Sequence, residues 1–195
     1  MSEPLTAAER TYLLKLARKS IEQTVRGQSL SPLVPSEWTE TLQAPGVSFV
    51  TLTLTRSGAL RGCVGALEAY QPLVEDVREH AIAAAQKDYR FPPVNKSELG
   101  AIQVEISRLT KPEQLEYSSP EDLLEKLELG RDGVILRDDW KRATFLPQVW
   151  EKVNSKEEFL AQLCRKMGVV GDHWRRKHLE VLTYQVEDFH EKIYK

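Results

Sequence analysis

The sequence predicts an α+β fold in which antiparallel sheets are flanked by helices. Segments rich in β-branched and aromatic residues occur as neighbouring pairs, at residues 46–67 and 133–146, and each pair encloses a short turn. Helical patterns separate these pairs, but strand and helix do not alternate regularly as they do in a doubly wound parallel sheet. Antiparallel hairpins with helices beside them are the arrangement that this order favours.

Four helices are expected, each beginning at a residue that commonly opens a helix: Thr6, Pro72, Ser119 and Ser155. Glu9 follows Thr6, and Glu158 follows Ser155, at the spacing of a capping box. Glycines near residues 27 and 168 predict the ends of the first and last helices.

The strands are expected in two hairpins and two single segments. The hairpins should turn at residues 56–58 and 138–140, where polar residues and glycine interrupt the apolar runs. Residues 101–109 alternate apolar and polar side chains, so Ile102, Val104 and Ile106 should face a core. Residues 179–189 are expected to form one late strand.

Length, charge and cysteine content exclude several classes of protein. The 195 residues suit one domain, or one domain with two lobes, and the formal net charge of -2 gives no surface for nucleic acid. No apolar run approaches the roughly 20 residues that span a bilayer, and the N-terminal residues lack the pattern of a secretory signal. With 2 cysteines a disulfide framework is not expected, so the sequence predicts reduced thiols and a cytoplasmic protein without a membrane partner.

The stretch LRGCVG, residues 60–65, places a cysteine between two glycines in a segment that otherwise resembles a strand. Alternate side chains of a strand share a face. Leu60 and Val64 should therefore face the core, whereas Arg61 and Cys63 should face a cleft. A guanidinium near a thiol favours the thiolate, which is the nucleophilic form.

The two glycines of this stretch can be explained in the same way. Gly65 would leave space beside Cys63 for a ligand, and Gly62 would permit a bulge that re-aims the cysteine. The alternative is that Cys63 is a small buried hydrophobe, as cysteines usually are. From the stretch alone both explanations stay open.

LRGCVG resembles the signature LRGCIG of the AMMECR domain family, with valine in place of isoleucine. Other stretches follow in the family's order and spacing: GVSFVTL before it, RFPPV at 90–94, VEISRL at 104–109, FLPQVW at 145–150, CRKMG at 164–168 and FHE at 189–191. The chain is thus identified as a member of this family over nearly its whole length.

The resemblance implies an α+β fold of two subdomains around a cleft that the LRGCVG strand lines. The larger subdomain would hold both termini, in residues 1–109 and 168–195, and the smaller would span residues 110–167. Bacterial and archaeal relatives look like partners of a Memo protein and of a radical S-adenosylmethionine (radical SAM) enzyme, so proteins of these kinds are the expected partners. The family name brings no assigned reaction.

One departure from the family concerns a polar loop. Many members have a histidine in a Gly-x-His-Gly stretch, where this chain has Gly130-Arg131-Asp132-Gly133. Asp132 could still accept a proton, so it remains a candidate binding residue, but a metal role is weakened. Cys164, His173 and His178 match no compact zinc site, and no phosphate-cradling loop is found, so neither a metal nor a cofactor is expected.

Four more residues are candidates for the site. Glu105 could pair with Arg61 or act as a general base beside Cys63, or it could lie on an ordinary exposed strand face. Arg90 and Phe91 could present a cation and an aromatic ring at the rim of a cleft, or they could merely end a helix. Gln148 could bind a ligand or lie on the first turn of a helix.

Two functions are compatible with these residues. The first is an enzyme for a small organic substrate, in which Cys63 is the nucleophile or redox thiol, Arg61 binds an anionic group or holds the thiolate, and Glu105 moves protons. The second is a binding or adaptor domain, in which the same cleft holds a metabolite or a partner's peptide. The sequence places the enzyme slightly ahead.

Overall fold

The structure, a computed structural model, describes residues 4–192 and divides into two compact units. Residues 110–186 form the smaller unit, and the segments before and after them together form the larger unit. The prediction assigned residues 168–195 to the larger subdomain, but residues 168–186 belong to the smaller unit. The reason is strand pairing, because β7 (Glu180–Tyr184) lies between two strands of the smaller unit's sheet.

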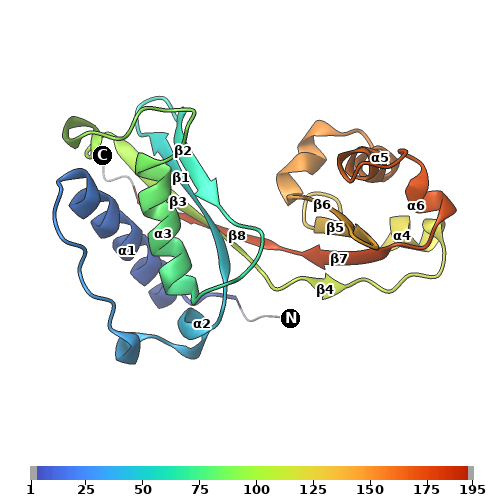
Figure 1. Ribbon diagram of the computed structural model, residues 1–195, viewed down its shortest axis with the longest axis horizontal. Coiled ribbons are helices and arrows are strands. Elements are labelled where there is room, and N and C mark those ends of the chain that lie inside the picture. The colour runs from blue at the N-terminus through green and yellow to red at the C-terminus, as the bar shows by residue number, and fades with distance from the viewer. Residues whose placement is uncertain (1–3, 193–195) are drawn as a thin grey trace. The chain divides into compact units, whose positions relative to one another are not determined.

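The larger unit is built on a four-stranded antiparallel sheet in the order β2-β1-β3-β8 (Figure 1). Its strands are β1 (Val47–Leu54), β2 (Leu60–Gly65), β3 (Ile102–Leu109) and β8 (Val186–His190). The long helices α1 (Ala7–Val25) and α3 (Leu73–Gln86) both pack on one face of this sheet. The short elements are α2 (Glu40–Gln43) and the 3-10 helices η1 (Pro35–Glu37) and η2 (Lys96–Glu98).

The core of the larger unit lies between that sheet face and the two long helices. Leu13 and Ile21 of α1 and Val77 of α3 are fully buried there against Val50 and Leu52 of β1. The alternation predicted for β3 is confirmed, since its apolar residues point into this core and its polar residues point to the other face. We call this other face, which neither α1 nor α3 covers, the helix-free face.

The smaller unit has its own four-stranded sheet, in the order β4-β7-β5-β6. The strands besides β7 are β4 (Glu113–Gln114), β5 (Gly133–Asp138) and β6 (Lys141–Phe145). The helices are α4 (Pro120–Lys126), η3 (Pro147–Lys152), α5 (Lys156–Lys166) and α6 (His173–Arg176). The rings of Trp150 and Phe159 stack at 3.6 Å in the core of this unit.

The α+β class is confirmed, and most helix ends lie where capping predicted them. Thr6 and Glu9 form both hydrogen bonds of a capping box, and Gly168 ends α5 with a φ of 82°. The box at Ser155 is only half formed, because the Glu158 carboxylate accepts from Asn154 rather than from the N-cap backbone. Among residues 4–192, no helix combines the length and apolar character that a bilayer crossing requires.

The late strand is two strands rather than one. β7 ends at Tyr184 and β8 begins at Val186, and the two strands belong to different sheets. Gln185 joins them, and its backbone pairs with Thr110, the residue that follows β3. An uninterrupted β-pattern in the sequence therefore supplies strands to both units.

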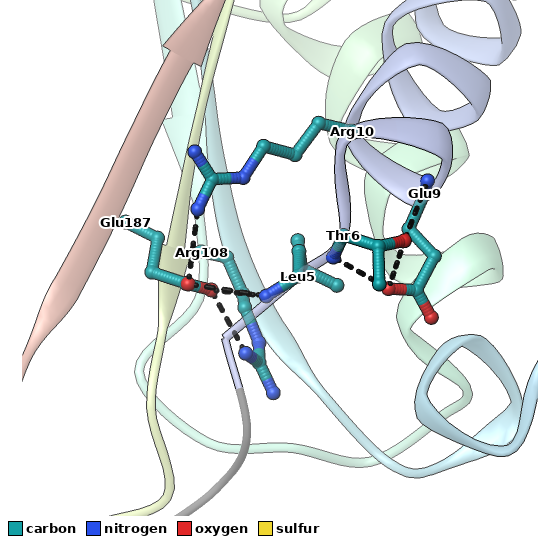
Figure 2. A network of polar contacts seen from close by, with 6 residues as sticks. All are labelled: Leu5, Thr6, Glu9, Arg10, Arg108 and Glu187. Atoms are coloured by element: carbon teal, nitrogen blue, oxygen red, sulfur yellow. Dashed lines mark hydrogen bonds and ion pairs between the residues drawn. The ribbon is translucent and has the colours of Figure 1, made fainter.

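Glu187 attaches β8 to the rest of the larger unit (Figure 2). Its carboxylate accepts a hydrogen bond from the Leu5 backbone at 3.2 Å and from Arg108 of β3 at 2.8 Å, and Arg10 of α1 approaches at 3.4 Å. One carboxylate at the start of the last strand thus connects that strand with the segment before α1, with α1 and with β3.

Candidate functional site

A β-bulge interrupts the LRGCVG strand at Arg61. Leu52 pairs with Gly62 and Thr53 pairs with Leu60, so Arg61 is the extra residue. Because of the extra residue, the side chains before the bulge point to the opposite face from the one that simple alternation predicts. Val64 packs against the core as predicted, but Leu60 does not and is 41% exposed. The prediction that both aliphatic residues face the core was therefore wrong for Leu60.

Arg61 is held by a carboxylate that sequence reasoning did not identify. Its Nε donates to Glu98 Oε1 at 2.7 Å and its Nη2 to Glu98 Oε2 at 3.1 Å, so the pair is bidentate. The hydrogen bond from Arg61 lowers the pKa of Glu98 below its usual range. The hydrogen bonds of this guanidinium go to η2, and not to Cys63 or Glu105 as the sequence suggested.

The two glycines serve packing rather than access to the thiol. A β-carbon on Gly62 would lie 2.2 Å from the carbonyl oxygen of Ala84, so the strand touches the backbone of α3. A β-carbon on Gly65 would lie 2.3 Å from the ring of Phe49, which already occupies that space. The expectation that Gly65 keeps room beside the cysteine is therefore wrong, whereas the bulge next to Gly62 is confirmed.

Cys63 is half-buried on the helix-free face, in a row of polar residues that crosses three strands. Thr51 pairs with Cys63 on one side and with Glu105 on the other. The Thr51 hydroxyl donates to Cys63 Sγ at 3.3 Å. Because neighbouring strands are about 4.8 Å apart, Cys63 and Glu105 are separated by about 10 Å. Glu105 is thus not a base in direct contact with the thiol.

The backbone of Cys63 is bound from the loop that follows α3. Its N–H donates to Asp88 Oδ2 at 2.8 Å, and Arg90 Nη2 donates to its carbonyl oxygen at 3.2 Å. Arg90 also donates to Asp88 at 2.7 Å, and this hydrogen bond holds the pKa of the Asp88 carboxyl well below its usual range. The two side chains occupy backbone groups of an edge strand that would otherwise be open to pairing.

Phe91 completes this cluster. The guanidinium carbons of Arg61 and Arg90 lie 6.0 and 5.6 Å from the centre of its ring, within the range of cation–π contacts. Arg90 and Phe91 therefore do lie beside the cysteine strand. The sequence prediction missed Thr51, Asp88 and Glu98. Of these only Asp88 has a local signal, its position two residues before Arg90.

The remaining two candidates belong to the smaller unit. Asp132 is buried, and its Oδ2 accepts a hydrogen bond from the backbone of Glu128 at 2.8 Å. Its carboxylate therefore stabilises the loop in which it lies. Burial raises the pKa of this carboxyl. Gln148 is exposed on the first turn of η3, and no hydrogen bond of its side chain is found within residues 4–192.

The titratable residues of the described chain do not converge on a metal site. Within residues 4–192 no three of His, Cys, Asp and Glu are grouped so that they could hold an ion. Cys164 is fully buried in the core of the smaller unit. His173 instead lies 2.7 Å from Asp138, which also binds Lys177.

Comparison with known proteins assigns the chain to a family. The profile of the AMMECR1 family matches residues 14–189. The chain belongs to the AMMECR1 family. Protein MJ0810 of Methanocaldococcus jannaschii is 37% identical over 192 residues, covering 96% of this chain and 92% of the relative. A protein of Methanothermobacter thermautotrophicus is 39% identical over 193 residues, covering 96% and 97%.

A member of known structure has the same fold. The crystal structure of the uncharacterised protein PH0010 from Pyrococcus horikoshii superposes with a TM-score of 0.73 at 36% identity, covering 93% of this chain and 90% of that chain. The AMMECR1 assignment confirms the resemblance that began with LRGCVG. It brings a fold and no reaction, so function must be argued from the residues around Cys63.

Proposed function

We propose that this AMMECR1 protein is a thiol-dependent enzyme for a small organic substrate, which meets Cys63 on the helix-free face of the larger sheet. The observation that carries the proposal is the hydrogen bond from Thr51 to Cys63 Sγ, at 3.3 Å. A hydroxyl that donates to sulfur orients the side chain and stabilises the negative charge that the sulfur carries when it reacts as a nucleophile. Cys63 is half-buried, so the residue is not sealed inside the core.

The neighbouring residues have distinct parts in this proposal. Arg90 places a positive charge at the Cys63 carbonyl group and binds the strand in position. The side chain of Glu105 has no hydrogen bond or ion pair within residues 4–192, so its carboxylate is available to exchange a proton with a substrate lying across Thr51. Arg61 is a positioning residue here, because its guanidinium is engaged by Glu98 and stabilises the bulge.

The test is the rate of Cys63 alkylation by iodoacetamide at neutral pH, in a Cys164→Ala background. We expect the folded protein to react several-fold faster than the same chain unfolded in urea. Thr51→Val removes the hydroxyl at nearly constant volume and should abolish this advantage. Thr53→Val is the matched control, since Thr53 lies two residues along the same strand, opposite Leu60. A folded protein whose Cys63 is slower than the unfolded chain would overturn the proposal.

A binding role without catalysis is the second candidate. It is favoured by Tyr89, which is 96% exposed beside Arg90 at the edge of the sheet. Tyrosine and arginine are enriched among the residues that dominate protein interfaces. The partners to test are a Memo-type protein and a radical SAM enzyme. A complex that survives Cys63→Ala but is lost with Tyr89→Ala would favour this role over the enzyme.

A further inference from the structure

A groove in the larger unit lies away from Cys63. It has a volume of about 820 Å³ and runs along α1, the start of β3 and the end of β8. Cys63 lies on β2, at the opposite edge of the sheet, and neither Thr51 nor Glu105 lines the groove, so the groove is not part of the site proposed above. Its volume is within the roughly 300–1,000 Å³ of pockets that hold small organic molecules.

The groove has apolar side chains on all three elements that form it. Leu14 of α1 is half-buried, and Ile102 of β3 and Phe189 of β8 are buried side chains that contribute to its walls. Of these, Leu14 offers a ligand accessible surface for its apolar body, whereas Ile102 and Phe189 are 3% and 7% exposed and contribute little.

The charged side chains around the groove are mostly positive. Among residues 4–192, four lysines and arginines line it, against a single acid, Glu191. Arg18 neutralises Glu191 and donates its other N–H groups to the carbonyl oxygens of Leu99 and Ile102 at 3.0 and 2.9 Å. Lys15 and Lys192 are exposed and have no hydrogen bond or ion pair within the described chain. Two cations are therefore left for a ligand.

Arg10 adds a further unsatisfied donor to the same wall. Its guanidinium approaches Glu187 through one terminal nitrogen (Figure 2) and lies 5.8 Å from the centre of the Phe189 ring. Its Nε is buried and has no acceptor among residues 4–192. A buried donor without a partner costs free energy. An anion bound in the groove would interact favourably with the positive charge of Arg10, which has only the Glu187 carboxylate beside it among the described residues.

We propose that this groove binds a small amphipathic anion. Lys15 and Lys192 would hold its carboxylate, sulfonate or phosphate group, and the apolar wall around Leu14 would contact its apolar body. The excess of unpaired positive charge selects the negative head, and the apolar walls select against inorganic anions, which have no body to bury.

The first experiment uses 8-anilinonaphthalene-1-sulfonate, an amphipathic anion whose fluorescence rises in apolar surroundings. We expect saturable one-to-one binding, with amide chemical-shift changes that centre on α1 and β8. N-phenyl-1-naphthylamine, which lacks the sulfonate, should bind more weakly. Equal affinity for the two probes, or shift changes centred elsewhere, would overturn the proposal.

The second experiment uses charge reversal on exposed positions that do not carry the fold. Lys15→Glu combined with Lys192→Glu should weaken binding of the sulfonate by at least about tenfold, because the loss of one charge-assisted contact alone has roughly that effect. Lys19→Glu is the matched control, because Lys19 is an exposed lysine one turn along α1 that does not line this groove. If Lys19→Glu weakens binding as much as the double variant, only the overall charge matters and the groove is not the site.

Discussion

A β-carbon on Gly62 would lie 2.2 Å from the carbonyl oxygen of Ala84, so strand β2 and helix α3 are in backbone contact at this point. The glycine before Cys63 is therefore required by packing. Because α3 lies directly against β2 here, the strand has one covered face, and the cysteine that follows must point to the other. The contact sets the face on which the thiol is found.

Gly62→Ala should destabilise the protein by about 1–3 kcal/mol, the usual cost of overpacking, because the obstacle is backbone and cannot rotate away. Gly100→Ala is the control, since a β-carbon there meets nothing within 4 Å. It should be neutral or stabilise by up to about 1 kcal/mol. Chemical denaturation of both variants measures the difference, and equal stabilities would contradict the close contact.

Glu187→Gln should cost about 1.5–3 kcal/mol, because charge-assisted hydrogen bonds to Leu5 and Arg108 are weakened in a largely buried setting. Glu180→Gln on β7 changes a comparable pair with Arg137, but both of its side chains are about 40% exposed. An exposed pair contributes about 0–1 kcal/mol. Urea unfolding of the two variants should separate them, and a larger loss for Glu180→Gln would show that the network of Figure 2 does not stabilise the unit.

Acid should remove the stabilisation that Asp88 provides. Hydrogen bonds from Arg90 hold the pKa of the folded Asp88 carboxyl well below its ordinary value of 3.8. A carboxyl whose pKa is lowered by folding stabilises the protein above that ordinary value and loses its contribution as the pH falls toward the folded pKa. Asp88→Asn should therefore be less stable than the wild type at neutral pH, and the gap should narrow below about pH 4.

The measurement for Asp88 is the free energy of unfolding between neutral pH and strong acid. Asp139→Asn is the control, because this carboxylate is 80% exposed and lies 3.5 Å from Lys177. It should follow the wild-type profile closely. A difference between wild type and Asp88→Asn that stays constant down to strong acid would show that the Asp88 carboxylate does not carry the effect.

The two cysteines should differ in reactivity in the wild-type protein. Cys164 is 0% exposed, and burial raises the pKa of its thiol. Native protein treated with iodoacetamide should therefore take up one label, at Cys63, and a second only after denaturation. Intact mass and peptide mapping give the answer. If Cys164 is labelled first, this prediction is wrong. The core of the smaller unit would then open faster than iodoacetamide reaches Cys63.

Features decided by near neighbours could be predicted from the sequence. The capping box of Thr6 and Glu9 joins residues three apart, and the turn of the second hairpin depends on Asp139 and its neighbours. The family, the hairpins and the placing of Cys63 next to a bulge followed from such patterns. Helix caps and hairpin turns are stabilised by interactions between residues a few positions apart, so a short stretch of sequence is enough to predict them.

The sequence by itself thus determined the α+β class, the main helices and hairpins, and the strand that holds the candidate thiol. Tertiary structure decided the partners. Arg61 binds Glu98, 37 residues away, rather than Glu105, and a continuous β-pattern divides at Gln185 between two sheets. The physical reason is that such choices depend on which distant segments the packed core brings into contact, and a linear pattern records which side of a strand is apolar but not what will cover it.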